Sequence, residues 1–135
     1  MPLYRSDADR CAYLQTLGRV AGSLRWRCLA YCLMTNHVHL LVQTPEANLS
    51  SGMQLLHGRY AQGFNFRHER SGHVFQGRFG AVLVESDAHL CAVAAYIARN
   101  PVAATLCDRP QDFPWSSFAV TAESTEPSWL DVERL

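Results

Sequence analysis

Two histidines separated by a valine are the residues of this sequence best suited to chemistry. His37 and His39 open the stretch HVHLLVQ, residues 37–43, whose alternation is typical of a β-strand. Because side chains two positions apart on a strand point to the same face, both imidazoles project together. Paired imidazoles suit divalent cations such as Mn²⁺, Zn²⁺, Co²⁺ or Ni²⁺. The same pattern is also typical of two ordinary histidines beside a turn, so spacing alone leaves both interpretations open.

A tyrosine and an asparagine one helical turn apart form the second candidate group. In the helix expected over residues 86–99, Tyr96 lies well off the apolar face, and Asn100 follows four residues later. An exposed hydroxyl there is available to a ligand, and the amide oxygen of Asn100 can reach a metal or a phosphate. His89 lies on the same side of the helix. The alternative is a partly exposed tyrosine and an asparagine that ends the helix before Pro101.

The third group is a basic and aromatic stretch, residues 57–80. Its arginines, histidines and phenylalanines face a single acid, Glu69. This mixture suits single-stranded nucleic acid, because guanidinium groups pair with phosphates and rings stack on bases. A solvated helix end and loop, with the phenylalanines in the core, explains the composition equally well. Tyr60 lies on the apolar stripe of the expected helix, which favours core packing over a role as nucleophile.

The elements that position these groups follow the order helix, strand, strand, helix, strand, helix. The periodicity predicts helices over 6–24, 48–68 and 86–99, and strands over 25–34, 37–43 and 78–85. This is the order of a ferredoxin-like α+β fold, an antiparallel sheet with helices on one face, with its first strand missing. Because that strand is central in the fold, we expect the histidine strand to have an unpaired edge. We also expect an added upstream strand to raise stability.

Composition narrows the class of protein further. The 135 residues suffice for one globular domain, with 48% hydrophobic and 18% charged residues. Twelve basic residues, all arginine, balance twelve acidic ones, so bulk positive charge does not drive binding, although a local basic patch remains open. The sequence has no apolar run of membrane-spanning length and no signal peptide. Five scattered cysteines do not form a disulfide framework, which favours reduced thiols and a cytoplasmic location.

In this order the three groups resemble the IS200-like, single-tyrosine (HUH-type) transposases, and within them the REP-associated tyrosine transposases. The resemblance covers about residues 4–118. It is carried by YCLMTNHVHLLVQTP (31–45), RYAQGFNFRHERSGHVFQGRF (59–79), YIARNPVAA (96–104) and PWSSF (114–118). It implies a catalytic domain over 1–118, truncated at its N-terminus because the family usually begins with a strand of the type YHVTxRGxxR. Residues 119–135 are then an acidic C-terminal tail.

The resemblance also implies the activity and the roles of single residues. Family members cut and rejoin single-stranded DNA beside a hairpin through a covalent 5′-phosphotyrosine, with Mg²⁺ or Mn²⁺. Tyr96 matches the nucleophile, His37 and His39 match the metal ligands, and Asn100 stands where a further polar ligand is supplied, often by glutamine. The residues expected to hold the DNA are Arg59, Arg67, Arg70, His73 and Arg78.

Other functions compete with strand transfer. A catalytically inactive remnant would bind hairpin DNA without cutting it, and a regulatory metal-binding protein would not bind DNA at all. A relaxase or rolling-circle initiator shares the histidine and tyrosine chemistry but usually has a longer histidine cluster and a larger domain. The sequence leaves open whether the chain acts as a monomer or as a homodimer.

Overall fold

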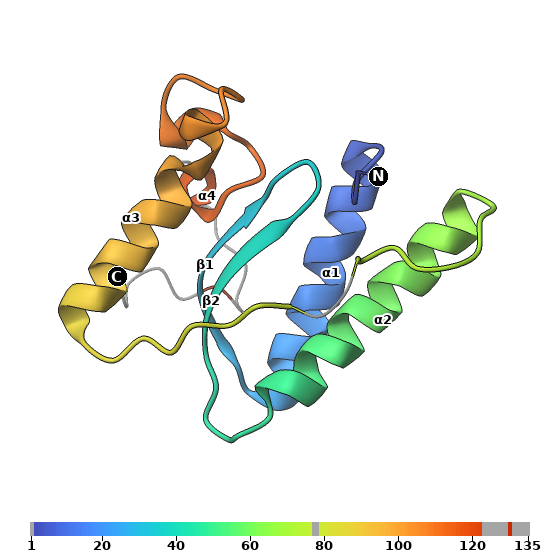
Figure 1. Cartoon of the computed structure of the whole chain (residues 1–135), viewed down its shortest axis with the longest axis horizontal. Helices are drawn as coiled ribbons and strands as arrows, with labels where there is room; N and C mark the ends of the chain where they lie inside the picture. Colours follow the sequence, from blue (N-terminus) through green and yellow to red (C-terminus); the bar gives the residue numbers. More distant parts are fainter. Residues whose placement is uncertain (1, 77–78, 123–129, 131–135) are drawn as a thin grey trace.

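The computed structural model describes residues 2–76, 79–122 and 130, and it has the α+β class that the sequence predicts. A helix precedes a β-hairpin, and two further long helices follow it (Figure 1). The elements are α1 (Asp7–Leu24), β1 (Arg27–Leu33), β2 (Val38–Gln43), α2 (Leu49–Arg67), α3 (Asp87–Ala103), the short 3₁₀ turn η1 (Pro110–Asp112) and α4 (Ser117–Ala122). No helix in the described ranges is long and apolar enough to cross a lipid bilayer.

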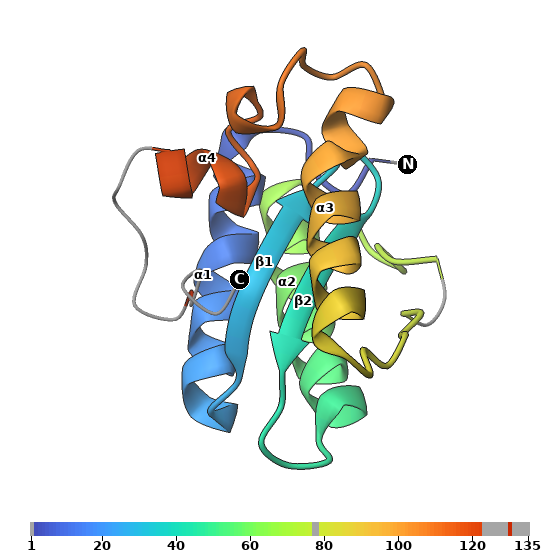
Figure 2. The ribbon, with the colours of Figure 1, turned by 90° about the vertical axis from the view of Figure 1, so that its left-hand side faces the viewer.

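The hairpin lies between two helical layers, which corrects the expectation of helices on one face only. Seen from two directions, α1 and α2 cover one face of the hairpin and α3 covers the other (Figures 1 and 2). The core accordingly has two clusters, one shared with α1 and α2 and one shared with α3. The reason is visible in β1, which is buried at every position after Arg27 and therefore needs cover on both faces.

The register of the hairpin assigns each side chain to a face. Val38, Leu40 and Val42 of β2 pack against the α1–α2 cluster, whereas Leu41 packs against α3. A bulge in β1 between Cys28 and Ala30 breaks the alternation. The two buried cysteines of β1 therefore belong to opposite faces, Cys28 to the α1–α2 side and Cys32 to the α3 side, although a regular strand would place them together.

Burial decides the chemistry of the cysteines in this hairpin. All five cysteines of the chain are free thiols, as expected. Burial raises the pKa of Cys28 to about 12, and burial is also the main cause that raises the pKa of Cys32 to about 12. A protonated thiol is a poor nucleophile, so these two residues act as small apolar side chains. Cys11 and Cys91, by contrast, are exposed.

The predicted third strand is absent, and the sheet within the described residues has only two strands. Residues 79–85 form an irregular segment between α2 and α3, and position 78 lies outside the described residues. Val82 and Leu83 are 79% and 77% exposed there. A strand forms only where a neighbour pairs with its backbone, and no neighbouring strand is adjacent to this segment. The ferredoxin-like sheet is therefore not formed, whereas the expected unpaired edge of β2 is confirmed within the described ranges.

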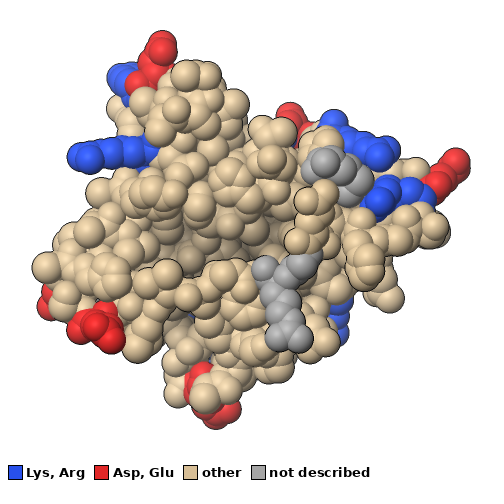
Figure 3. Space-filling view, in the orientation of Figure 1, with Lys and Arg blue, Asp and Glu red and all other residues tan. Residues whose placement is uncertain are grey.

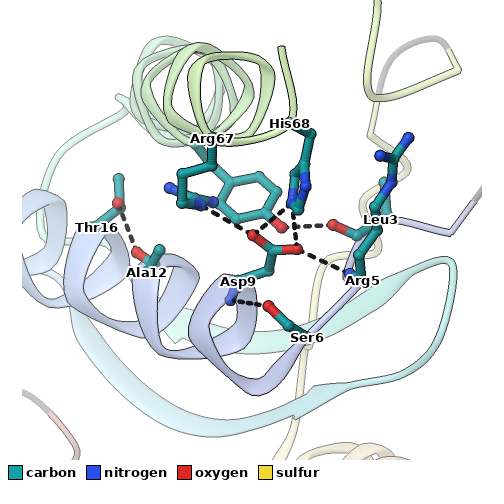
Figure 4. Close-up of polar contacts among 9 residues, drawn as sticks. Leu3, Arg5, Ser6, Asp9, Ala12, Thr16, Arg67 and His68 are labelled. Carbon is teal, nitrogen blue, oxygen red and sulfur yellow. Dashed lines mark hydrogen bonds and ion pairs between the residues drawn. The ribbon is translucent and has the colours of Figure 1, made fainter. Parts of the chain in front are cut away.

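Helix α1 begins where the sequence predicts, at a serine cap. The hydroxyl of Ser6 accepts a hydrogen bond from the backbone N–H of Asp9. The carboxylate of Asp9 is fully buried and accepts hydrogen bonds from the Arg5 backbone, the Arg67 guanidinium and the His68 ring (Figure 4). These contacts join the start of α1 to the end of α2.

The apolar stripe of α2 faces the core as predicted. Its buried members are Gly52, Met53, Leu56, Tyr60 and Phe64. The hydroxyl of Tyr60 donates to the backbone carbonyl of Leu3, which confirms the core interpretation of this tyrosine. Gly52 is required for close packing, because a Cβ atom there would collide with the Trp26 ring.

Helix α3 continues past the point where the sequence predicts its end. Ser86 caps it as expected, but the helix runs through Asn100 and Pro101 to Ala103. A proline disfavours the helical conformation in the residue before it without forbidding it. The ring of Pro101 is fully buried, and this packing offsets the lost backbone hydrogen bond.

The outer edge of β1 is covered by the C-terminal part of the chain. Leu33 donates its N–H to the Trp115 carbonyl, Tyr31 donates to the Ser117 hydroxyl, and Cys32 forms a bridge with Ser116. These contacts protect one edge of the hairpin from further pairing. The predicted acidic tail lies outside the described residues for the most part.

Candidate active site

The two histidines of β2 and the turn before it come together as the spacing predicts. Their ring centroids are 4.8 Å apart and nearly perpendicular. His39 pairs across the hairpin with Cys32, a residue of the α3 side, so its ring lies on the face that α3 covers. His37 is exposed and His39 is half-buried.

Tyr96 of α3 lies next to this histidine pair. The ring centroids of His39 and Tyr96 are 5.6 Å apart and nearly perpendicular. Tyr96 is 61% exposed, in agreement with its predicted place off the apolar face, while its neighbours Ala94 and Ile97 are buried against the hairpin. The packing of α3 on the hairpin therefore brings together two groups that are far apart in the sequence.

The environment of His39 favours its neutral form. Burial lowers the pKa of His39, the nearby His37 lowers it further, and a hydrogen bond with Asn100 acts in the opposite direction. Asn100 thus approaches His39 from α3, one turn beyond Tyr96. A neutral imidazole offers a lone pair to a cation, which a protonated one does not.

His37 has a hydrogen-bond partner that the sequence analysis did not assign. Its Nδ1 lies 2.9 Å from the side-chain oxygen of Asn36. Asn36 precedes the histidine in the turn between the strands, and both residues are exposed. A hydrogen bond at one ring nitrogen orients the ring and leaves the other nitrogen, Nε2, free to act as a ligand.

The residues present fit a divalent cation through one specific feature. The Nε2 atom of His39 is buried and has no hydrogen-bond partner in the part of the chain that the structure describes. Such an atom is costly unless something binds it. No cluster of three or more His, Cys, Asp or Glu side chains occurs among the described residues. A cation here would accordingly be held by His37 and His39, with the amide oxygen of Asn100 as a further candidate ligand.

The predicted DNA-binding residues of the described chain lie elsewhere. Figure 1 places the end of α2 and the loop after it on the side of the molecule opposite α3, and Figure 3 shows arginine side chains gathered there. Arg67 pairs with Asp9 at 2.9 Å. Arg70 donates to Asn65 and to the His73 carbonyl.

The remaining predicted contacts have fewer constraints. Arg59 is exposed on α2, and the side chain of His73 is exposed in the loop after it. Arg78 lies outside the described residues. The structure therefore does not bring these arginines to the histidine pair, and their contact with DNA stays a prediction.

An arginine that the sequence analysis did not single out is much nearer. Arg99 is exposed on α3, three residues after Tyr96 and directly before Asn100. Residues three apart on a helix are neighbours on its surface, and this spacing could have drawn attention to Arg99. Among the described arginines, it is the one that belongs to the same helix as Tyr96.

A broad cavity of about 1300 Å³ adjoins the site. His37, His39 and Tyr96 contribute to its lining, together with β2, α2, α3 and the segment 79–85. The candidate residues are thus at the wall of an open groove rather than in a closed core. A polymer as large as a nucleic-acid strand can reach them there.

This geometry defines a class of site. An exposed phenol beside a pair of imidazoles that fits a cation is suited to nucleophilic attack on a metal-held group. Comparison with known proteins gives the family: residues 4–100 match the family of IS200-like transposases, and the chain belongs to it.

A relative supports this assignment at a distance. The chain is 28% identical over 133 residues to a Haemophilus influenzae protein described as "Putative REP-associated tyrosine transposase". The match covers 89% of this chain and 73% of the relative. No solved structure gives a significant match.

Proposed function

We propose that the protein cuts and rejoins single-stranded DNA at hairpins, as in transposition, with Tyr96 as the nucleophile and Mg²⁺ or Mn²⁺ as cofactor. The observation that carries this proposal is the contact between His39 and Tyr96, whose ring centroids are 5.6 Å apart. Membership of the transposase family supports the type of substrate. The contact supports the type of chemistry, since it sets an exposed hydroxyl beside the paired imidazoles.

The covalent step is a transesterification. The Tyr96 oxygen attacks the scissile phosphorus, a new P–O bond to tyrosine forms, and the bond to the 3′ oxygen breaks. The 5′ end is then held as a phosphotyrosine and a 3′-hydroxyl leaves. That hydroxyl, or one from another strand, attacks the phosphotyrosine in the reverse step, so joining needs no external energy source.

The residues around Tyr96 have separate tasks in this step. The phenol has an ordinary pKa near 10 and must lose its proton during attack. Because Tyr96 is 61% exposed, water can receive that proton. His37, His39 and Asn100 would hold the cation, which when bound supplies Lewis-acid stabilisation of the charge on the scissile phosphate.

The arginines would hold the DNA at two distances from the reaction. Arg99, beside Tyr96 on α3, is placed to pair with a phosphate near the scissile one. Arg59, Arg70 and His73 are remote from the site and would bind a more distant part of the substrate, such as the hairpin stem. Arg67 can share in this contact only to the extent that its ion pair with Asp9 allows.

A gel assay tests the proposal. Labelled hairpin oligonucleotides are incubated with the protein and Mn²⁺, and the products are separated under denaturing conditions. We expect a covalent adduct with the wild type and with Tyr13→Phe, a tyrosine of α1 remote from the site. We expect none with Tyr96→Phe or with the double variant His37→Ala/His39→Ala. Hairpin binding without any wild-type adduct would instead identify an inactive remnant of a transposase.

A further inference from the structure

The groove beside β2 has the boundaries of a vacant position in a sheet. Its lining combines the strand β2, which lacks a second neighbour within the described residues, with the segment 79–85 and parts of α2 and α3. Figure 3 shows the surface hollowed in the middle of this face. The volume of about 1300 Å³ is far larger than the gaps left by ordinary side-chain packing.

Backbone groups face this groove from both sides without partners on the chain. β2 pairs with β1 on one edge, and no backbone hydrogen bond joins its other edge to another part of the described chain. Within residues 79–85, the hydrogen bond found is from the Glu85 N–H to the His89 ring, at 3.4 Å. Two such edges on either side of a groove match the needs of an extended polypeptide, which pairs through its own N–H and C=O groups.

The side chains of the groove favour polypeptide over nucleic acid. Apart from the histidines and a few polar groups, the lining is aliphatic and aromatic, with Leu40, Val42, Met53 and Phe75 as examples. Its charged members within the described residues are two acids, Glu85 and Asp87, and it includes no described arginine. A phosphate backbone would be repelled there, whereas a strand with apolar side chains would cover apolar surface.

The exposure of the segment 79–85 points the same way. Val82 and Leu83 are among the most exposed large apolar side chains of the described residues. β-Branched and aliphatic residues of this type favour strands when a neighbour is present. The sequence AVLVE at 81–85 therefore has strand-forming residues in a place where the described chain provides no strand to pair with.

We propose that the groove accepts one extended strand from a partner polypeptide, which pairs with β2 on one side and with residues 79–85 on the other. The strand would be about six residues long, the length of β2, with apolar side chains at alternate positions. A basic residue at one end would complement Glu85 and Asp87. This inference does not depend on the proposed DNA chemistry.

A synthetic peptide tests the proposal directly. The probe is Val-Thr-Val-Thr-Val-Thr-Arg-Arg, and the matched control has proline at two of the threonine positions, which removes backbone N–H groups without adding charge. Amide signals of the ¹⁵N-labelled full chain are followed during titration. We expect shifts concentrated in residues 38–43 and 79–85 for the first peptide, and affinity at least tenfold weaker for the proline peptide. Equal binding of both peptides, or of neither, would overturn the proposal.

A variant and two competitors separate this occupant from others. Leu83→Asp should weaken peptide binding at least tenfold, while Leu106→Asp, a substitution of another exposed leucine outside the groove, should leave it unchanged. Both sites are exposed, so neither change is expected to unfold the protein. An oligothymidine that shifts the same β2 amides and displaces the peptide would overturn the proposal in favour of DNA. A chain that dimerises through β2 at working concentration would overturn it in favour of a second copy.

Discussion

The carboxylate of Asp9, in the first turn of α1, accepts a hydrogen bond of 2.9 Å from Nε of Arg67, in the last turn of α2 (Figure 4). Asp9 is fully buried, and His68 and the Arg5 backbone complete its shell. Burial alone would raise the pKa of Asp9, but the hydrogen bonds from Arg5, His68 and Arg67 outweigh it and lower the pKa below its usual value. The ionised carboxylate is therefore part of the folded structure.

Replacement of Asp9 by asparagine should destabilise the fold by about 2 kcal/mol, because Arg67 and His68 lose their charged acceptor. Urea unfolding at pH 7 measures this loss. The low pKa also fixes the pH dependence: the contribution is complete above the unfolded pKa of an aspartate and is lost as pH falls through the lower folded pKa. Asp9→Asn should lack this acid-induced loss, and an unchanged loss in the variant would contradict the assignment.

His57 should produce a second pH dependence at higher pH. Burial lowers the pKa of His57 to about 4, and its Nε2 lies 3.0 Å from the Tyr13 hydroxyl. The unfolded state takes up a proton near pH 6.5 and the folded state does not, so stability should fall between pH 6.5 and 4. With a discount for partial solvent access, the loss is on the order of 2 kcal/mol. His57→Gln should remove most of it in unfolding curves recorded across this range.

Gly52 should tolerate no larger residue. Its Cα faces the Trp26 ring, which is itself held by a hydrogen bond of 2.8 Å to the Asn48 side chain. Gly52→Ala should destabilise the protein by about 2 kcal/mol, since overpacking outweighs the better helix propensity of alanine. The control is Gly58→Ala on the same helix, where the added methyl meets open space and should stabilise slightly. Equal melting temperatures for the two variants would contradict the packing argument.

The two groups of arginines should be separable by kinetics. Arg99→Ala should slow adduct formation at least tenfold with little change in hairpin affinity at saturating DNA. Arg59→Ala should mainly weaken binding and reduce the slope of affinity against salt by about one. Binding is measured by fluorescence anisotropy at several salt concentrations, and cleavage by single-turnover assays. If Arg59→Ala slowed cleavage of bound DNA as much as Arg99→Ala, the division would be wrong.

Local rules predicted most single elements of this fold. The cap at Ser6, the stripe of α2 and the exposed position of Tyr96 on α3 follow from short-range preferences that the tertiary structure retains. The pairing of His37 with His39 also followed from strand alternation. Their approach to Tyr96 did not follow from spacing, because it depends on how α3 packs across the hairpin.

The errors all concern partners that a local pattern cannot see. Residues 78–85 have strand-forming side chains, but the described chain provides no strand to pair with them. Pro101 disfavours a helix locally, yet its buried ring keeps α3 continuous. The helices cover both faces of the hairpin because β1 is apolar on both sides, a signal that was present in CLAYCLM at 28–34 but not used. Arg67 looked available to DNA until the structure showed its partner, Asp9.

The most direct test of the account is to identify the amino acid that carries the DNA. Wild-type protein is incubated with a hairpin oligonucleotide and Mn²⁺, digested with nuclease and protease, and analysed by mass spectrometry. The account predicts a nucleotide attached through its 5′-phosphate to the peptide that contains Tyr96. It also predicts loss of this product in Tyr96→Phe. Attachment to another residue, or an adduct that persists in Tyr96→Phe, would contradict the role assigned to Tyr96 beside His39.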